Sequence, residues 1–471
     1  MIRSRSLSAA LLCAGALLAA PLHAQPGAGG PPPGPGGPGG PPPAMPTMAD
    51  THYDTTIEVR EGKLVKGAAS ARLGATFSQG AAIASARDGL NGVFISGGHS
   101  AFTLARAHIR LAGMGRNDFL GIGAGALVRD NAALVIDHAD IDTRGATASA
   151  VVAAEGATLR VYDSHLATHG GPLPKGYVRH IGPGMMEPPA PLGLDGDART
   201  VLAMSNSRSF FYRTTIEADG WGALSTDATG GHLYAEANDC TLIVHQRGYG
   251  AYADFGAHVV INRSKVDSGG EVGIIAGAAR IDLNRVTGKA GRYGVMIHSV
   301  MGDPQEVAEL NLADTSLVTT GPAFLVKSAN ARITIHGGQI ASAAGRLLEL
   351  RRNEDANATQ THGATVPGVT LTLAAADLAG DVVNSDGDRA LRLRLEGARL
   401  SGALHHVVLA ADAASHWRAT AASEVALAPG AALGAIDAAA GITITATTQD
   451  PALVAGPRPL PSGGVLLITA G

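Results

Sequence analysis

Residues 219–256, DGWGALSTDATGGHLYAEANDCTLIVHQRGYGAYADFG, contain one short pattern twice, first as GWGALSTD and then as GYGAYAD. Between the copies lies an apolar run that ends in Asn238 and Asp239. Apolar and polar residues alternate with a period of two, which predicts β-strands and not helices. Because the unit returns every 21 to 30 residues, roughly, the stretch indicates a solenoid.

The same unit recurs from about residue 70 onward. Each copy is a short alternating strand, a small polar corner, a β-branched residue or leucine, and a glycine turn. No stretch has the i, i+3, i+4 apolar spacing of helical arrays, and no L-x-x-L-x-L frame is present. We therefore predict a parallel β-helix in which each strand pairs with its equivalent one rung further on. The copies are 132–145, 157–170, 207–220, 257–270, 279–291, 308–321 and 331–345.

In repeat style, residues 70–450 resemble the right-handed parallel β-helix, or pectin-lyase-like, superfamily. They also resemble adhesin-like and autotransporter-passenger sequences, with no membrane barrel expected after the last rungs. The resemblance implies an all-β fold, a single right-handed parallel β-helix over residues 49–471. A fold shared by many activities does not fix which of them this chain has.

The N-terminal residues predict export. Residues 1–24 have Arg3 and Arg5 before a short apolar run, as a signal peptide does, and we expect cleavage after Ala24. Residues 25–48 are almost pure glycine and proline and are expected to form an extended tether. We therefore expect a secreted or periplasmic protein.

Composition excludes several partners. The formal net charge is −4 and no basic run occurs, which argues against nucleic acid or anionic lipid as a partner. No later apolar run is long enough to span a membrane. Cys240 is the only cysteine after Cys13, so no intramolecular disulfide is expected. We expect a monomer whose partner is a polysaccharide or cell-surface glycan.

Residues 168–199, THGGPLPKGYVRHIGPGMMEPPAPLGLDGDAR, break the rhythm with six prolines and no alternation. The segment predicts a long loop that leaves the β-helix between two rungs. Long loops in a regular solenoid are often functional. This loop directly precedes the aromatic rungs, which favours a functional role.

Aligning the turn glycines Gly222, Gly250, Gly273 and Gly294 predicts which side chains stack. Thr226 or Asp227 is then expected beside Asp254, because parallel pairing brings successive rungs to about 5 Å. Two neighbouring carboxylates could form an acid/base or cation-binding pair, or be solvated corner residues. The predicted catalytic residues are Asp227, Asp254, Tyr252, Arg199, His298 and Lys327.

Nine of the 18 aromatic residues fall between Tyr177 and Phe255. Sugar rings stack on exposed aromatic faces, whereas buried rings would simply fill the core. Trp221 begins a strand directly after a turn glycine, and we expect it to be exposed. The predicted substrate-binding residues are Trp221, Tyr249, Tyr212, Tyr177 and Thr226.

A further column, Asp137, Asp163, Asn238, Asn262 and Asn284, is expected to be structural, since stacked corner amides bond to one another. The string Val135-Ile136-Asp137-His138 resembles the W-I-D-H signature of family 1 pectate lyases, but the tryptophan and the accompanying motifs are missing. His165, His169 and His180 lack tight metal-ligand spacing, so no metal site is predicted.

Two functions remain open. The first is an exported enzyme that cuts an acidic polysaccharide between the 168–199 loop and rungs 219–300. A lyase would use Arg199, Lys327, His298 or Tyr252 as the base and Asp227 with Asp254 to hold a cation such as calcium; the cofactor is otherwise unknown. A hydrolase would use the two carboxylates directly. The alternative is a non-catalytic, adhesin-like binding rod.

Overall fold

The computed structural model describes residues 47–68, 72–181, 184–227, 232–299, 302–355, 358 and 365–470. Contacts divide the chain into Met1–Ala44 and Met45–Gly471, and only the second unit contains described residues. The predicted signal peptide and residues 25–46 of the predicted tether lie outside them. In the part of the chain that is described, no helix has the length and apolar character needed to cross a membrane.

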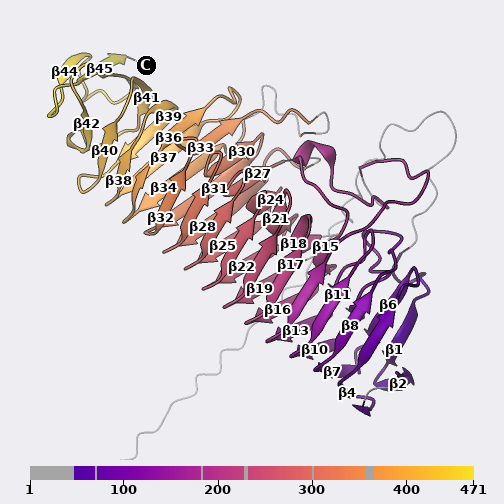
Figure 1. Cartoon of the computed structure of the whole chain (residues 1–471). Coiled ribbons are helices and arrows are strands. Elements are labelled where there is room, and N and C mark those ends of the chain that lie inside the picture. Colours follow the sequence, from indigo (N-terminus) through magenta and orange to yellow (C-terminus); the bar gives the residue numbers. More distant parts are fainter. Residues whose placement is uncertain are drawn as a thin grey trace, which may run out of the picture. The chain divides into compact units, whose positions relative to one another are not determined.

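Each coil of the chain contributes three short strands, which pair in parallel with their equivalents one coil further on (Figure 1). The predicted parallel β-helix is confirmed. Two successive coils illustrate the pattern, because β18 pairs with β21, β19 with β22 and β20 with β23. Their bounds are β18 (Trp221–Asp227), β19 (Tyr234–Asn238), β20 (Thr241–Val244), β21 (Gly248–Asp254), β22 (His258–Asn262) and β23 (Lys265–Ser268).

The equivalent strands form three ladders. The first ladder carries the sheet face on which the predicted catalytic residues lie. It consists of β1 (Asp54–Arg60), β6 (Leu90–Ser96), β9 (Ala126–Arg129), β12 (Val151–Ala153), β15 (Arg199–Met204), β18, β21, β24 (Glu271–Ala276), β27 (Val295–His298), β30 (Phe324–Lys327), β33 (Arg346–Arg351), β36 (Asp381–Asn384) and β39 (Leu404–Ala411).

The second ladder runs over the next face and reaches the end of the described chain. It consists of β4 (Phe77–Gln79), β7 (Ala101–Ala105), β10 (Ala133–Asp137), β13 (Thr158–Tyr162), β16 (Arg208–Tyr212), β19, β22, β25 (Arg280–Asn284), β28 (Val307–Ala313), β31 (Asn330–His336), β34 (Val369–Ala374), β37 (Leu391–Glu396), β39, β41 (Ser423–Leu427), β43 (Thr443–Thr448) and β45 (Val465–Ala470).

The third ladder is interrupted once. Its strands are β5 (Ala82–Ser85), β8 (His108–Leu111), β11 (Asp140–Thr143), β14 (His165–Thr168), β17 (Thr215–Ala218), β20, β23, β26 (Thr287–Ala290), β29 (Ser316–Thr319) and β32 (Gln339–Ser342), followed by β35 (Asp377–Ala379), β38 (Arg399–Ser401), β40 (His416–Ala419) and β42 (Ile436–Ala438). Antiparallel partners β2 (Lys63–Lys66), β3 (Arg72–Leu73) and β44 (Gly456–Pro459) lie near the ends.

The inward side chains of the three ladders form one continuous apolar core. Alternation explains it, since every second residue of a strand points to the same face. Leu310, Ile333, Leu371 and Leu393 occupy one inward position of four successive strands and are each buried. Cys240, the one cysteine in the described residues, is a free thiol. Burial of such apolar columns therefore supplies the stability of the fold.

The predicted register is wrong by one residue on the first ladder. Gly222 lies opposite Tyr249, not Gly250, and Gly273 lies opposite Val295, not Gly294. A shift of one residue reverses the face to which a side chain points. Ser225 lies opposite Tyr252, where the pairing of β18 and β21 ends, so Thr226 is not level with Asp254, and Thr226 is fully buried. Burial of the apolar side chains determines how the strands of the first ladder pair. The four aligned glycines do not occupy equivalent positions in these strands.

The predicted amide column is confirmed for three residues. Asn262 donates to Asn238 Oδ1 at 3.0 Å, and Asn284 donates to Asn262 Oδ1 at 2.9 Å. The prediction for Asp163 is wrong, because Tyr162 occupies this position and lies opposite Asp137. Tyr162 in turn lies opposite Tyr212, and Tyr212 lies opposite Asn238. The column therefore consists of aromatic rings on β13 and β16 and of amides from β19 onward.

The long loop is confirmed between β14 and β15, where the described residues contain no strand and one short 3₁₀ turn, η1 (Ala190–Leu192). The loop folds back over the outer face of the first ladder. Met185 and Leu192 pack there against Trp221, Tyr249 and Ile274. The loop thereby covers the part of this face that β18, β21 and β24 form.

We predict that Asn262→Ala lowers the free energy of unfolding by about 1–3 kcal/mol, because it leaves the amides above and below without their partner. Urea unfolding followed by circular dichroism measures the change. The control Lys265→Ala, at an exposed position of the following strand, should change stability by less than about 0.5 kcal/mol. Equal effects of the two substitutions would contradict a structural amide column.

Candidate functional site

A buried ion cluster lies on the outer face of the first ladder. The Arg199 side chain contacts the carboxylate of Asp118 and donates from Nη1 to Asp227 Oδ2 at 3.0 Å. The side chains of Arg199 and Asp118 are each 2% exposed. Arg199 and Asp227, both predicted to be catalytic, are therefore brought together, but with a third, unpredicted partner, Asp118, from the segment between β8 and β9.

Aromatic rings enclose this cluster. The Arg199 guanidinium lies 5.0 Å from the ring centre of Trp221 and 5.7 Å from that of Phe119. Trp221 is 2% exposed, so the expectation that it would be exposed is wrong. Its φ of 54° is a backbone conformation that bulky residues rarely adopt, and the loop residue Met185 packs against its side chain.

Two carboxylates share one guanidinium in this cluster. Burial raises the pKa of Asp118 to about 7 and also raises the pKa of Asp227, although Arg199 opposes both shifts. If both Asp118 and Asp227 were ionised, the cluster would carry a net negative charge away from water, which is unfavourable. Because the cluster is enclosed and its charges are paired, we assign Arg199 a structural role.

Tyr249 and Tyr252 continue the covered surface. Their ring centres lie 5.1 Å apart, and the Tyr249 hydroxyl is 2.9 Å from Ser225 Oγ. Gly222 makes this possible, because a Cβ atom there would lie 1.9 Å from the Tyr249 ring. Burial and the neighbouring Asp254 raise the pKa of Tyr252 well above 10, so the phenol stays protonated.

His298 and Lys327, both predicted to be catalytic, face one another on adjacent strands but lie apart from the ion cluster. Ala276 separates Asp254 from His298 in the ladder. Burial lowers the pKa of His298 to about 4, and Lys327 adds to the shift, so the imidazole is neutral.

The remaining predicted residues are placed in three surroundings. The Tyr177 hydroxyl accepts from the Met186 amide within the loop at 2.8 Å. Tyr212 lies on the outer face of the second ladder. Thr226 donates to the Tyr252 carbonyl at 2.9 Å.

Glu271 is a fully buried carboxyl group beneath the loop. Arg292 Nη1 lies 3.3 Å from its Oε1 and also donates to the loop carbonyls of Leu192 and Gly193 at 3.1 and 2.9 Å. Burial raises the pKa of Glu271 to about 7, because Arg292 offsets only part of the lost hydration. Arg292 thus links this carboxyl to the covering loop.

An open cavity of about 230 Å³ lies at the base of the loop, at the corner between the third and first ladders. His169 and Asp219 follow β14 and β17, whose register places them opposite one another. Asp197 enters from the returning end of the loop. Sequence reasoning missed this site, although the equivalent positions of His169 and Asp219 were a usable signal. The lining residues are Thr168, His169, Gly170, Gly171, Gly196, Asp197, Ala198, Asp219, Gly220 and Gln246.

The two carboxyl groups of the cavity have different surroundings. Asp219 Oδ1 lies 3.1 Å from His169 Nδ1, and His169 Nε2 lies 3.5 Å from Asp142 Oδ2. Asp197 accepts only the Gly171 amide at 3.0 Å among the bonds described for its side chain. Burial, reinforced by the charges of Asp219 and Glu187, raises the pKa of Asp197 to about 6. A Cβ atom on Gly170 would lie 2.2 Å from Asp197 Oδ1, so glycine permits this approach.

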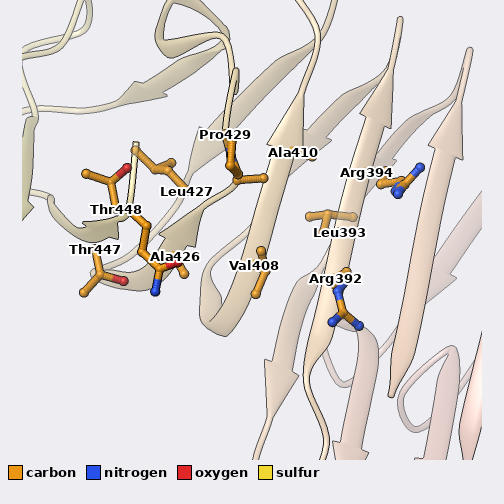
Figure 2. A pocket seen from close by; sticks show the side chains of 12 residues that line it. Arg392, Leu393, Arg394, Val408, Ala410, Ala426, Leu427, Pro429, Thr447 and Thr448 are labelled. Carbon is orange, nitrogen blue, oxygen red and sulfur yellow. The ribbon is translucent and has the colours of Figure 1, made fainter. Parts of the chain in front are cut away.

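A second hollow, of about 460 Å³, lies on the second ladder between β37 and β43. Figure 2 shows Arg392 and Arg394 on one side of it and Thr447 and Thr448 on the other. Val408, Ala410 and Ala426 of the intervening strands β39 and β41 also line it. Its lining includes no carboxylate or histidine among the described residues, which therefore offer no acid/base pair there.

Among the described residues, Asp137, His138 and Asp163 have ligand atoms within 4.8 Å of one another. Arg213 already binds both oxygens of Asp163, each at 2.7 Å. We therefore interpret this group as a surface ion cluster and assign it no metal.

No family model matches the sequence, and no curated protein shows significant similarity to it. Function must therefore be argued from the geometry of these residues.

We predict that Glu271→Gln removes part of the pH dependence of stability. The folded state binds the Glu271 proton up to about pH 7 and the unfolded state only up to about 4.5, so stability contributed by this group falls as pH rises between these values. At pH 8 the variant should be more stable than the wild type by up to about 3 kcal/mol.

Urea unfolding between pH 4.5 and 8 measures this difference, which should vanish at the acidic end. Glu396→Gln, at an exposed position of β37, is the matched control and should follow the wild-type curve. If Glu271→Gln also follows the wild-type curve, the buried carboxyl is not held as described.

Proposed function

We propose that the protein is a glycoside hydrolase whose site is the cavity at the base of the loop. The observation that carries the proposal is the pair Asp197 and Asp219, two carboxyl groups that line one cavity in different surroundings. Enzymes commonly obtain an acid and a base from two carboxyl groups by giving them different environments.

Asp197 is the general acid. Its raised pKa keeps a proton on the carboxyl in mildly acidic solution, ready for donation to the leaving glycosidic oxygen. Asp219 is the general base and takes a proton from the attacking water, while His169 holds its carboxylate in place. The glycosidic C–O bond breaks as the bond from carbon to the water oxygen forms, and solvent restores both protonation states.

The lining favours a neutral sugar at the position of cleavage. Its described residues include two carboxyl groups and neither lysine nor arginine, so a uronate there would meet like charge. An acidic polysaccharide, which the superfamily resemblance implies, is thus less favoured at this cavity. The predicted export and the resemblance to right-handed, pectin-lyase-like β-helices both support an extracellular glycan as substrate.

The lyase mechanism has weaker support. It requires a base beside a uronate whose carboxylate is neutralised by a cation. Arg199 and Asp227 are paired with one another beneath the loop, and Tyr252 is kept protonated by burial. These contacts favour hydrolysis at the cavity over elimination at the buried cluster.

The test is incubation of the protein with a panel of neutral and acidic polysaccharides at pH 5.5. We expect new reducing ends from a neutral glycan without the ultraviolet absorbance of unsaturated ends. Asp197→Asn and Asp219→Asn should each lower the rate by about 10²–10⁴-fold. The wild-type rate should fall as pH rises through about 6, because Asp197 loses its proton.

Asp239→Asn is the matched control, since this exposed aspartate pairs with Arg263 at another corner. It should retain the wild-type rate. Absence of reducing ends from every neutral glycan, or an unchanged rate for Asp197→Asn, would overturn the hydrolase proposal and favour the non-catalytic, adhesin-like alternative.

A further inference from the structure

The outer face of the second ladder carries a cluster of aromatic and arginine side chains that the cavity does not use. It spans β13, β16, β19 and β22, and its side chains are partly or fully exposed. We call it the aromatic face. It comprises Arg160, Tyr162, Arg208, Phe210, Tyr212, Tyr234 and His258.

Parallel register stacks these residues at the spacing of the rungs. Tyr162 lies opposite Tyr212, and their rings are 5.0 Å apart and within 9° of parallel. Phe210 and Tyr234 approach to 5.7 Å, and Tyr234 and His258 to 5.4 Å. The rings therefore form two groups at neighbouring positions of the register, Tyr162 with Tyr212 and Phe210 with Tyr234 and His258, which together span four rungs.

Two arginines are held on these rings. The Arg160 guanidinium lies 5.4 Å from the ring centre of Phe210, and that of Arg208 lies 5.9 Å from the ring centres of both Phe210 and Tyr234. Within the described residues neither arginine forms a salt bridge. Stacking restricts these long side chains before a ligand arrives, which reduces the entropy lost on binding.

Two carboxylates of the same ladder are hydrogen-bonded to neighbouring side chains, and of these only Asp282 is paired with a basic side chain. Glu236 accepts from the Tyr234 hydroxyl and from Asn238, each at 2.9 Å. Asp282 pairs with His258 at 2.7 Å and with Arg280 at 2.9 Å. β13 and β16 themselves carry Arg160 and Arg208 and contain no carboxylate, so this end of the face attracts anions, whereas the end towards β19 keeps the negative charge of Glu236.

The backbone restricts what can bind here. These strands lie inside a ladder and are paired on both sides, so they leave no edge to which a peptide could add as a strand. A polymer bound here must use side chains alone. Aromatic surfaces flanked by hydroxyl and amide groups suit sugar rings, and unpaired guanidinium groups suit their carboxylates.

We propose that the aromatic face is a non-catalytic binding site for an acidic glycan. Uronate carboxylates pair with Arg160 and Arg208, and the sugar rings lie against Phe210, Tyr212 and Tyr234. Since the cavity lies at the corner between the other two ladders, binding at this face and hydrolysis are separate functions, and either can fail without the other.

The test uses the full exported chain and immobilised polygalacturonate as the probe. We expect the wild type to bind, with weaker binding at higher salt. The double variant Arg160→Ala/Arg208→Ala should lose at least about tenfold in affinity, because it removes both unpaired cations. Tyr212→Leu should weaken binding while leaving the salt dependence unchanged.

Arg392→Ala/Arg394→Ala is the matched control, as it removes two exposed arginines from another strand of the same ladder. It should bind as the wild type does. Rates on a neutral glycan should be unchanged in all these variants, and unchanged urea midpoints should confirm their folding.

Three results would overturn the proposal. They are no binding of polygalacturonate by the wild type, equal loss in the control, and equally tight binding of poly-glutamate, which would show charge attraction without recognition of a glycan.

Discussion

Parallel backbone pairing between equivalent strands of successive coils is the constraint on which this structure depends. It brings residues about two dozen positions apart into direct contact and fixes which face of the sheet each side chain joins. The apolar core, the amide column and the aromatic face are all consequences of this one register. The residues of the 168–199 loop do not follow this register until the chain forms β15 at its end.

The three ladders have different outer surfaces, and this difference separates their roles. The loop and the segment before β9 cover the middle of the first ladder and enclose Arg199 with two carboxylates. The second ladder presents its rings and arginines to solvent. The corner between the third and first ladders is lined by glycines, and Gly170 leaves room for Asp197 in the cavity that His169 and Asp219 also line. We therefore place hydrolysis at the open corner and glycan binding on the exposed second ladder, and neither on the covered part of the first ladder.

Much of the fold could be predicted from the sequence, because period-two alternation and a constant repeat are local signals. The strands, the long loop and the column from Asn238 to Asn284 were all predicted correctly. The register of the first ladder was not, because glycines were aligned where burial decides the pairing. Gly222 lies opposite Tyr249, since its missing side chain makes room for that ring.

The candidate site was predicted less well, for a physical reason. Arg199 and Asp227 do meet, but whether they are open to solvent depends on how the loop folds, and no local pattern encodes that path. Asp118 and Asp197 reach their partners only through non-repeating segments. Trp221 was expected to be exposed because its turn position was read without the loop that packs against it.

The stacking register is the central claim, and a cysteine pair tests it most directly. Thr241 and Lys265 are outward-facing partners on β20 and β23. In a Cys240→Ser background, Thr241→Cys/Lys265→Cys should form a disulfide rapidly, because adjacent strands lie about 4.8 Å apart and a disulfide spans roughly 4.4–6.8 Å between Cα atoms. Thr241→Cys/Asp267→Cys, displaced by two residues, should remain reduced under the same oxidation. Rapid oxidation of the displaced pair, or none of the aligned pair, would contradict the register and every cluster built on it.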